Sequence, residues 1–202
     1  MKAFKVFTFF LLVSFLIISG VEIAAAIKDA DTLKNEVLRL HILAESDSSE
    51  HQALKLKVRD AVLENTSSLF ENAKSAEECA EIATQNISLI KQIAEKTLME
   101  NGSLAKVSVE VCKSYFPTKS YDEEITFPSG VYNAVKIKIG AAEGQNWWCV
   151  LFPQICLSTS ISKNSVTDDM LSSSSKELAA NKKPAARIKF KIIEELNKLF
   201  GK

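Results

Sequence analysis

Glycine is scarce in this sequence, with six residues in a chain of 202, and histidine is scarcer still, with two. No glycine-rich loop that could cradle a phosphate group is present, which excludes the common nucleotide-binding motifs. A serine nucleophile would need a Gly-x-Ser-x-Gly elbow or a positioned histidine, and neither pattern appears. His41 is placed on the polar side of a predicted strand and His51 in the first turn of a predicted helix, both ordinary positions for hydrogen-bonding histidines. We therefore predict a protein that is not an enzyme and uses no cofactor.

An excess of charge of either sign is also missing. Lysine and arginine together number 25, as do aspartate and glutamate. Residues 1–26 hold two lysines and one glutamate, so the remainder carries 23 basic and 24 acidic side chains and a net charge of −1. Nucleic-acid binding requires a strongly basic face, so no nucleic-acid partner is expected. Neither a Cys-x-x-Cys motif nor a Cys/His cluster at zinc spacing occurs, and no metal site is predicted.

The N-terminus carries the longest apolar run, the sixteen uncharged residues Val6 to Val21. Two lysines precede it, and the small residues Ala24–Ala26 follow. A basic start, an apolar middle and an Ala-x-Ala end are typical of a secretory signal peptide. A spanning helix needs about 20 apolar residues, so the run favours cleavage after residue 26, although an extension through Ile27 would allow an uncleaved anchor. In both cases residues 1–26 engage the membrane during export, and the remainder lies outside the cytoplasm.

Strand signals occur in four places after this segment. Residues 38–43, 107–111 and 131–139 alternate apolar and polar side chains, and 147–152 is a continuous apolar run. Gly140 to Gln145 separates the last two segments, which predicts that they pair as a hairpin. Continuous apolarity in 147–152 indicates a strand covered on both faces.

Helix signals lie between the first two strands. Residues 28–36 are polar and are interpreted as a linker or a short helical turn. Capping boxes of Ser49 with Gln52 and of Ser75 with Glu78 predict two helices, the second ending near Gly102. Because strands and helices are grouped, we predict an α+β fold. Its mainly antiparallel sheet would pack against the two central helices and a C-terminal helix in a single domain, residues 27–157, behind the signal or anchor segment.

The C-terminal part has a different composition. Residues 158–175 contain eight serines and two threonines, so 158–183 is predicted to be a serine-rich linker or loop. Residues 184–202 show apolar residues at helical spacing and are predicted to form an amphipathic helix. This helix is expected to cover the sheet, and the alternative is that it binds a membrane surface or a partner. The four cysteines allow three disulfide pairings, of which Cys149–Cys156 is favoured because Pro153 turns the intervening chain.

Two long strings carry a family resemblance. Residues 39–48, running on through 52–62, resemble the opening signature of the stage II sporulation protein R family, and Asn146–Pro153 with Cys156 is similar to its second signature. Residues 115–121 and 128–134 also match the family pattern, whereas 189–194 resembles its closing helix more weakly. The resemblance covers residues 37–157 well.

This resemblance implies an exported forespore signal without catalysis of its own. Such a protein crosses the forespore membrane into the intermembrane space, either released or still anchored. There it activates a membrane-embedded aspartic protease that cuts the precursor of sigma factor E. The alternatives are an exported cell-envelope binding module and an unrecognised extracytoplasmic hydrolase or thiol enzyme. A reactive cysteine of low pKa or a substrate cleft would indicate the enzyme.

Five residues are predicted to contact such a partner. Trp147 and Trp148 are neighbours in a strand and face opposite ways, so one would be buried and one exposed unless the strand is covered on both faces. Arg39, His41 and Asp47 would form a polar contact patch. Alternatively, Arg39 and Asp47 would pair with Asp60 and Arg59 to fix strand against helix.

Overall fold

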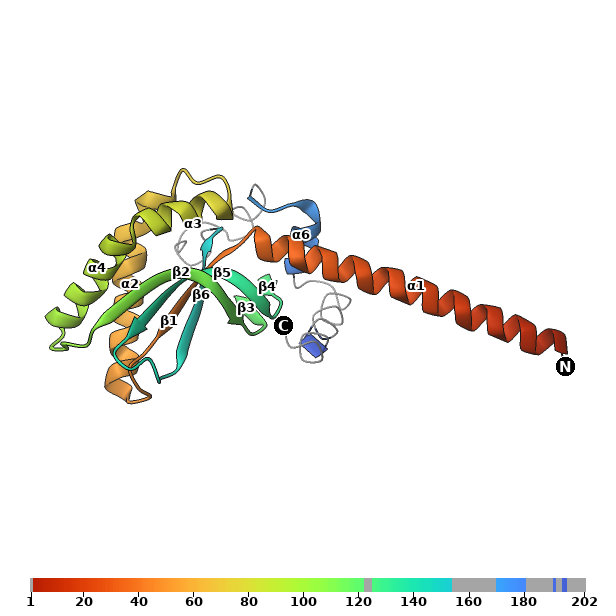
Figure 1. Cartoon of the computed structure of the whole chain (residues 1–202), viewed down its shortest axis with the longest axis horizontal. Helices are drawn as coiled ribbons and strands as arrows, with labels where there is room; N and C mark the ends of the chain where they lie inside the picture. Colours follow the sequence, from red (N-terminus) through yellow and green to blue (C-terminus); the bar gives the residue numbers. More distant parts are fainter. Residues whose placement is uncertain (1, 122–124, 154–169, 181–190, 192–193, 196–202) are drawn as a thin grey trace.

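The computed structural model describes residues 2–121, 125–153, 170–180, 191 and 194–195. A long helix, one strand, a group of helices and a group of strands follow one another along the chain (Figure 1). The α+β class predicted from this grouping is confirmed. The elements are α1 (Lys2–Asn35), β1 (Leu38–Leu43), α2 (Ser49–Phe70), α3 (Ala76–Gln85), α4 (Ile87–Glu100), β2 (Val107–Phe116), β3 (Lys119–Tyr121), β4 (Ile125–Phe127), β5 (Gly130–Ile139), β6 (Asn146–Phe152) and α6 (Ser173–Ala179).

The main sheet has the strand order β2-β5-β1-β6. β2 pairs with β5 and β6 pairs with β1 in antiparallel fashion, whereas β1 and β5 are parallel. The sheet is therefore mixed but mainly antiparallel, as predicted. The expected hairpin of β5 with β6 is wrong, because β1 lies between them. β1 is buried over residues 38–42, and such a strand is stabilised by pairing along both of its edges.

The connection from β5 to β6 passes over the end of β1. Adjacent strands lie about 4.8 Å apart, so strands that flank a third are about 10 Å apart, too far for a two-residue turn. The backbone N–H groups of Glu143 and Gly144 donate to the carbonyls of Glu45 and Ala44, at 3.3 and 2.9 Å. Gly144 is required here, because a Cβ atom would lie 2.3 Å from the carbonyl oxygen of Ser46.

Helices α2, α3 and α4 cover one face of the sheet (Figure 1). The segment predicted as one long helix is two helices, because Asn86 ends α3 and begins α4, and its side-chain amide donates to the carbonyl of Ile82. The cap at Ser75 is confirmed by its bond from the N–H of Glu78, at 3.1 Å. The N-cap of α2 is Ser48, one residue earlier than predicted, and its hydroxyl accepts from the backbone N–H of His51. Gln52 does not form the predicted capping box with Ser49, because its side-chain amide donates to the carbonyl of Ser46.

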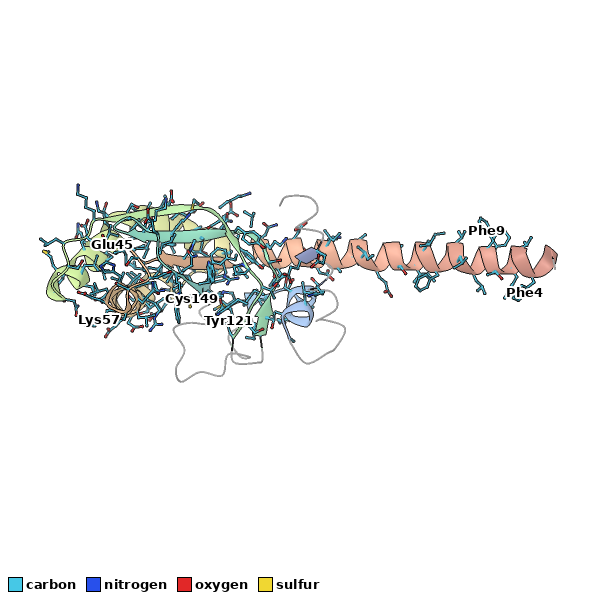
Figure 2. The ribbon with its side chains drawn as sticks, turned by 90° about the horizontal axis from the view of Figure 1, so that it is seen from below. Phe4, Phe9, Glu45, Lys57, Tyr121 and Cys149 are labelled. Carbon is cyan, nitrogen blue, oxygen red and sulfur yellow. The ribbon has the colours of Figure 1, made fainter. Side chains whose placement is uncertain are left out.

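Among the described residues, the other face of the sheet is covered only at the α1 end. A second apolar core joins the end of α1, the small sheet of β3 and β4, and α6. Its members include Ala30 and Leu33 of α1, Phe116 of β2 and Leu178 of α6. In Figure 2, Tyr121 lies beside the α1 end of the domain, and Glu45 lies toward the opposite end. Because Glu45 follows β1, that strand runs away from α1.

Helix α1 is continuous over 34 residues. Of the two interpretations of residues 28–36, the linker is wrong, and the helical turn is part of this long helix. Ala26, Ala30 and Leu33 form a buried stripe at helical spacing that holds this part against the domain. The stretch Val6–Asn35 is long and apolar enough to cross a membrane, and signal sequences share these properties. Phe4 and Phe9 project from its free end (Figure 2). The segment is thus compatible with a signal or an anchor.

The serine-rich segment is only partly described. Residues 154–169 lie outside the described residues, but residues 173–179 form α6, and Leu171 and Leu178 are buried in the second core. The linker prediction for 158–183 is therefore wrong over α6, which packs against α1 and β4. The predicted helix 184–202 lies outside the described residues except at positions 191, 194 and 195.

Candidate functional site

Two of the predicted contact residues, Arg39 and His41, lie on β1 facing away from α2, α3 and α4. Successive side chains of a strand point to opposite faces of the sheet. Leu38, Leu40 and Ile42 point into the apolar core beneath the helices, so Arg39 and His41 point to the other face. The sequence predicted these two faces correctly. The sequence also predicted that the face with His41 is polar and solvent-facing. In the structure, however, the side chain of Arg39 is completely buried and that of His41 is only 7% exposed.

Arg39 occupies a cage of aromatic rings. Its Nε donates to the carbonyl of Cys149 at 2.9 Å, and Nη2 donates to the Tyr121 hydroxyl at 2.8 Å. The guanidinium carbon lies 4.4 Å from the ring centre of Phe116 and 5.0 Å from that of Tyr132. Nη1 has no hydrogen-bond partner in the part of the chain that the structure describes. Arg39 thus joins β1, β6 and the small sheet through one side chain.

Tyr121 completes this arrangement. Burial raises the pKa of its phenol, although Arg39 opposes the rise, so the hydroxyl stays neutral. A neutral hydroxyl accepts from Arg39 and donates to the carbonyl of Trp148, at 3.3 Å. The sequence contained no signal for this role, because Tyr121 belongs to a three-residue strand without a periodic pattern.

His41 makes a second set of contacts, farther from α1. Its Nε2 lies 2.6 Å from the Asn146 side-chain oxygen, and its Nδ1 lies 3.2 Å from the Ser114 hydroxyl. The imidazole stacks on the indole of Trp148, with ring centres 6.1 Å apart. The register explains the stacking, because His41 and Trp148 are directly paired across β1 and β6.

Acidification is expected to destabilise the protein through His41. Burial lowers the pKa of His41 in the folded state, the hydrogen bond with Asn146 raises it in part, and Lys136 and Lys138 lower it again. The imidazole of His41 therefore binds a proton more readily in the unfolded chain than in the folded protein. The free energy of unfolding falls as the pH drops below 6.5, the ordinary pKa of histidine, and it levels off below the pKa of His41 in the folded state. Urea unfolding between about pH 7.5 and about pH 5 should show a smaller loss for His41→Gln than for the unaltered chain. Equal losses would contradict this role.

The surroundings of His41 form a part of the sheet that no described helix covers, which we call the polar sheet face. It is a plane of polar and charged groups from four strands, with one indole. Glu110 and Lys138 form an ion pair across β2 and β5 at 2.9 Å, and the lysine lowers the pKa of the Glu110 carboxyl. Such a face suits recognition of another macromolecule by polar contacts. Its members are His41, Glu110, Lys136, Lys138, Asn146 and Trp148.

Trp147 faces the opposite way, toward the helices, and both tryptophans are half-buried. Residues 149–152 of β6 are buried on both faces, as predicted for this strand, whereas each tryptophan is only partly covered. Arg59 of α2 lies over the Trp147 ring, 4.3 Å from its centre, and forms an ion pair with Asp60 at 2.6 Å.

The predicted pairs of Arg39 with Asp60 and of Asp47 with Arg59 do not form. Arg39 points to the face of the sheet opposite to α2, and Asp60 is already paired with its neighbour. The Asp47 carboxylate instead accepts from the backbone N–H of Gln145 at 2.7 Å. Arg39 and Asp47 therefore make contacts within the domain, and of the predicted contact residues only His41 and Trp148 lie side by side on one face of the sheet.

The cysteines divide into two kinds. Cys149 is disulfide-bonded, whereas Cys79 and Cys112 are free. Cys156 lies outside the described residues, so the Cys149–Cys156 pairing stays a prediction. Burial raises the pKa of Cys79 to about 12 and also raises that of Cys112, which is the reverse of the shift that activates a catalytic thiol. Within the described ranges, no group of three His, Cys, Asp or Glu side chains could hold a metal ion.

The structure thus defines a single α+β domain behind a signal or anchor helix. The family model for stage II sporulation protein R matches residues 34–163, which include all six strands. The chain therefore belongs to the stage II sporulation protein R family, as its signature strings predicted, and this membership gives it a role in sporulation. It is 37% identical over 151 residues to the stage II sporulation protein R of Bacillus subtilis (strain 168), a match that covers 70% of this chain and 66% of the relative. No solved structure matches.

Proposed function

We propose that this protein is an exported forespore signal that activates a membrane-embedded protease, which then cuts the sigma-E precursor. The proposal rests on family membership together with the order of the chain, in which a helix long and apolar enough to cross a membrane precedes the folded domain. Export across the forespore membrane would deliver that domain to the intermembrane space. The polar sheet face supports a binding role, because it offers exposed charges and an indole beside the buried contacts that hold them in place.

Activation in this proposal is a shift between two states of the protease. A ligand can favour the active state only by binding it more tightly than the inactive state. The domain therefore needs a rigid surface rather than a reactive group. The polar sheet face meets this need, because three of its four strands are fixed to one another by His41, through Ser114 on β2 and through Asn146 and Trp148 on β6.

The proposed function can be tested by producing the full chain with the protease and the sigma-E precursor in a host that does not sporulate. Precursor cleavage that depends on all three proteins is the expected result. Cleavage at the same rate without this chain, or none with it, would reject an activating role.

Trp148→Ala is expected to reduce precursor cleavage at least about tenfold in this assay, because interface tryptophans often contribute 2 kcal/mol or more to binding. Trp148 is the one large apolar side chain of the polar sheet face, so its removal takes away both contact area and the support of His41.

Trp147→Ala is the matched control, since the two residues are adjacent on β6 but face opposite ways. This variant should unfold at a lower temperature than the unaltered chain but still activate the protease while it is folded. Normal cleavage by a folded Trp148→Ala chain would remove the polar sheet face from the contact surface.

A further inference from the structure

Strand β2 forms one edge of the main sheet. It is ten residues long, about 33 Å, whereas strands commonly have five or six residues. β2 pairs with β5, and no other strand in the described ranges pairs with it. No described strand uses its outer backbone N–H and C=O groups, and proteins usually cover or shorten such an edge.

A hollow of about 550 Å³ lies beside this edge, between α3 and the middle of β2. Glu77 and Glu81 of α3 line one wall, and Val111 and Lys113 of β2 line the other. The two glutamates are one helical turn apart, and neither forms an ion pair with a described residue. The wall formed by α3 therefore favours a cationic side chain.

An exposed apolar pair continues the same surface toward α1. Tyr115 of β2 and Val131 of β5 are paired in register, and they are 50% and 43% exposed. They lie on the face that α3 and α4 cover farther along the sheet, two residues beyond Lys113. We call the hollow, the β2 edge and this pair the β2 groove.

We propose that the β2 groove binds an extended segment of the partner protein as a fifth strand of the sheet, a proposal that rests on the activating function above. The segment would place an apolar side chain on Tyr115 and Val131 and a basic side chain between Glu77 and Glu81. Backbone hydrogen bonds along β2 supply affinity in this binding mode, and the side-chain sites supply specificity.

A second copy of the chain fits the groove less well. Two β2 edges related by a two-fold axis must pair in antiparallel fashion if both keep the same sheet face upward. Helix α1 packs at the end of β2 that contains Phe116, and it extends away from the domain there (Figure 1). The two α1 helices would then point in opposite directions and could not enter one membrane.

The first test replaces Tyr115 in the full chain and measures precursor cleavage. Tyr115→Ala should reduce cleavage at least about tenfold, because it removes the aromatic contact of the β2 groove. Leu104→Ala is the control, since Leu104 is 88% exposed and lies outside the groove. It should leave cleavage unchanged, and both variants should keep the unfolding midpoint of the unaltered chain. Normal cleavage by Tyr115→Ala would overturn the proposal.

The second test detects the contact directly. A photo-crosslinking residue in place of Lys113 should join the chain to the protease, whereas the same residue in place of the exposed Glu64 on α2 should not. A product made of two copies of this chain, or no product in a sample where cleavage proceeds, would overturn the proposal and leave the activating function standing. If the unaltered chain triggers no cleavage, the activating function fails, and the fifth-strand proposal fails with it.

Discussion

Arg39→Ala is expected to lower the free energy of unfolding by about 3 kcal/mol or more. The substitution removes the hydrogen bond from Nε to the Cys149 carbonyl and opens a cavity between the rings of Phe116 and Tyr132. It also frees Tyr121 from β1, so the small sheet loses a polar link to the main sheet. Urea unfolding of the full chain in a mild detergent would measure the loss, and the fluorescence of the two tryptophans on β6 would report it.

Arg39→Met is the matched comparison for this prediction. Methionine fills much of the same volume and buries no charge, and replacing a buried charge with an apolar side chain of similar volume is often tolerated. This variant should therefore lose less stability than Arg39→Ala. Equal losses would show that packing contributes little and that the hydrogen bonds of Arg39 dominate. A loss below about 1 kcal/mol in both variants would contradict the clamping role.

Deletion of residues 2–26 is expected to abolish precursor cleavage in sporulating cells while the domain still folds. The deletion removes the exposed apolar part of α1 but keeps Ala30 and Leu33, which pack in the second core. The shortened chain would fold in the forespore cytoplasm, on the wrong side of the membrane from its proposed partner. Cleavage at the normal level would contradict an extracytoplasmic site of action.

A second variant separates export from anchoring. An unrelated cleavable signal peptide in place of residues 1–26 should restore cleavage if the native segment serves export alone. If the exported domain accumulates without restoring cleavage, the long α1 must remain attached as an anchor. Immunoblots of the chain from membrane and soluble fractions would confirm which form is present in each strain.

Local patterns in the sequence predicted much of the fold. The alternation in residues 38–43 correctly separated Leu40 and Ile42 from Arg39 and His41, and the cap at Ser75 placed the start of α3. These features depend on neighbours within a few residues, so sequence spacing is sufficient to identify them. The same reasoning identified the two faces of β6 on which Trp147 and Trp148 lie.

Contacts between distant segments could not be predicted in this way. The position of β1 between β5 and β6 depends on pairings across most of the domain, and a six-residue loop is compatible with either a hairpin or a crossing. The burial of Arg39 could not be predicted either, because the alternation of apolar and polar residues assigns a side chain to a face of the sheet but does not show what covers that face. That cover comes from Phe116, Tyr121 and Tyr132, which lie far along the chain. The part of α1 at residues 28–36 appeared polar because its apolar stripe is only one residue wide.

The central position of β1 has a consequence for the proposed export of the chain. Translocation requires an unfolded polypeptide, and β1 is the first strand to emerge after the apolar segment. Its partners emerge much later, since Arg39 and Cys149 are 110 positions apart. The sheet therefore cannot close until nearly the whole domain has passed through, and such long-range pairing forms slowly. If the chain is exported as proposed, the strand order itself would delay folding until the domain has reached the far side.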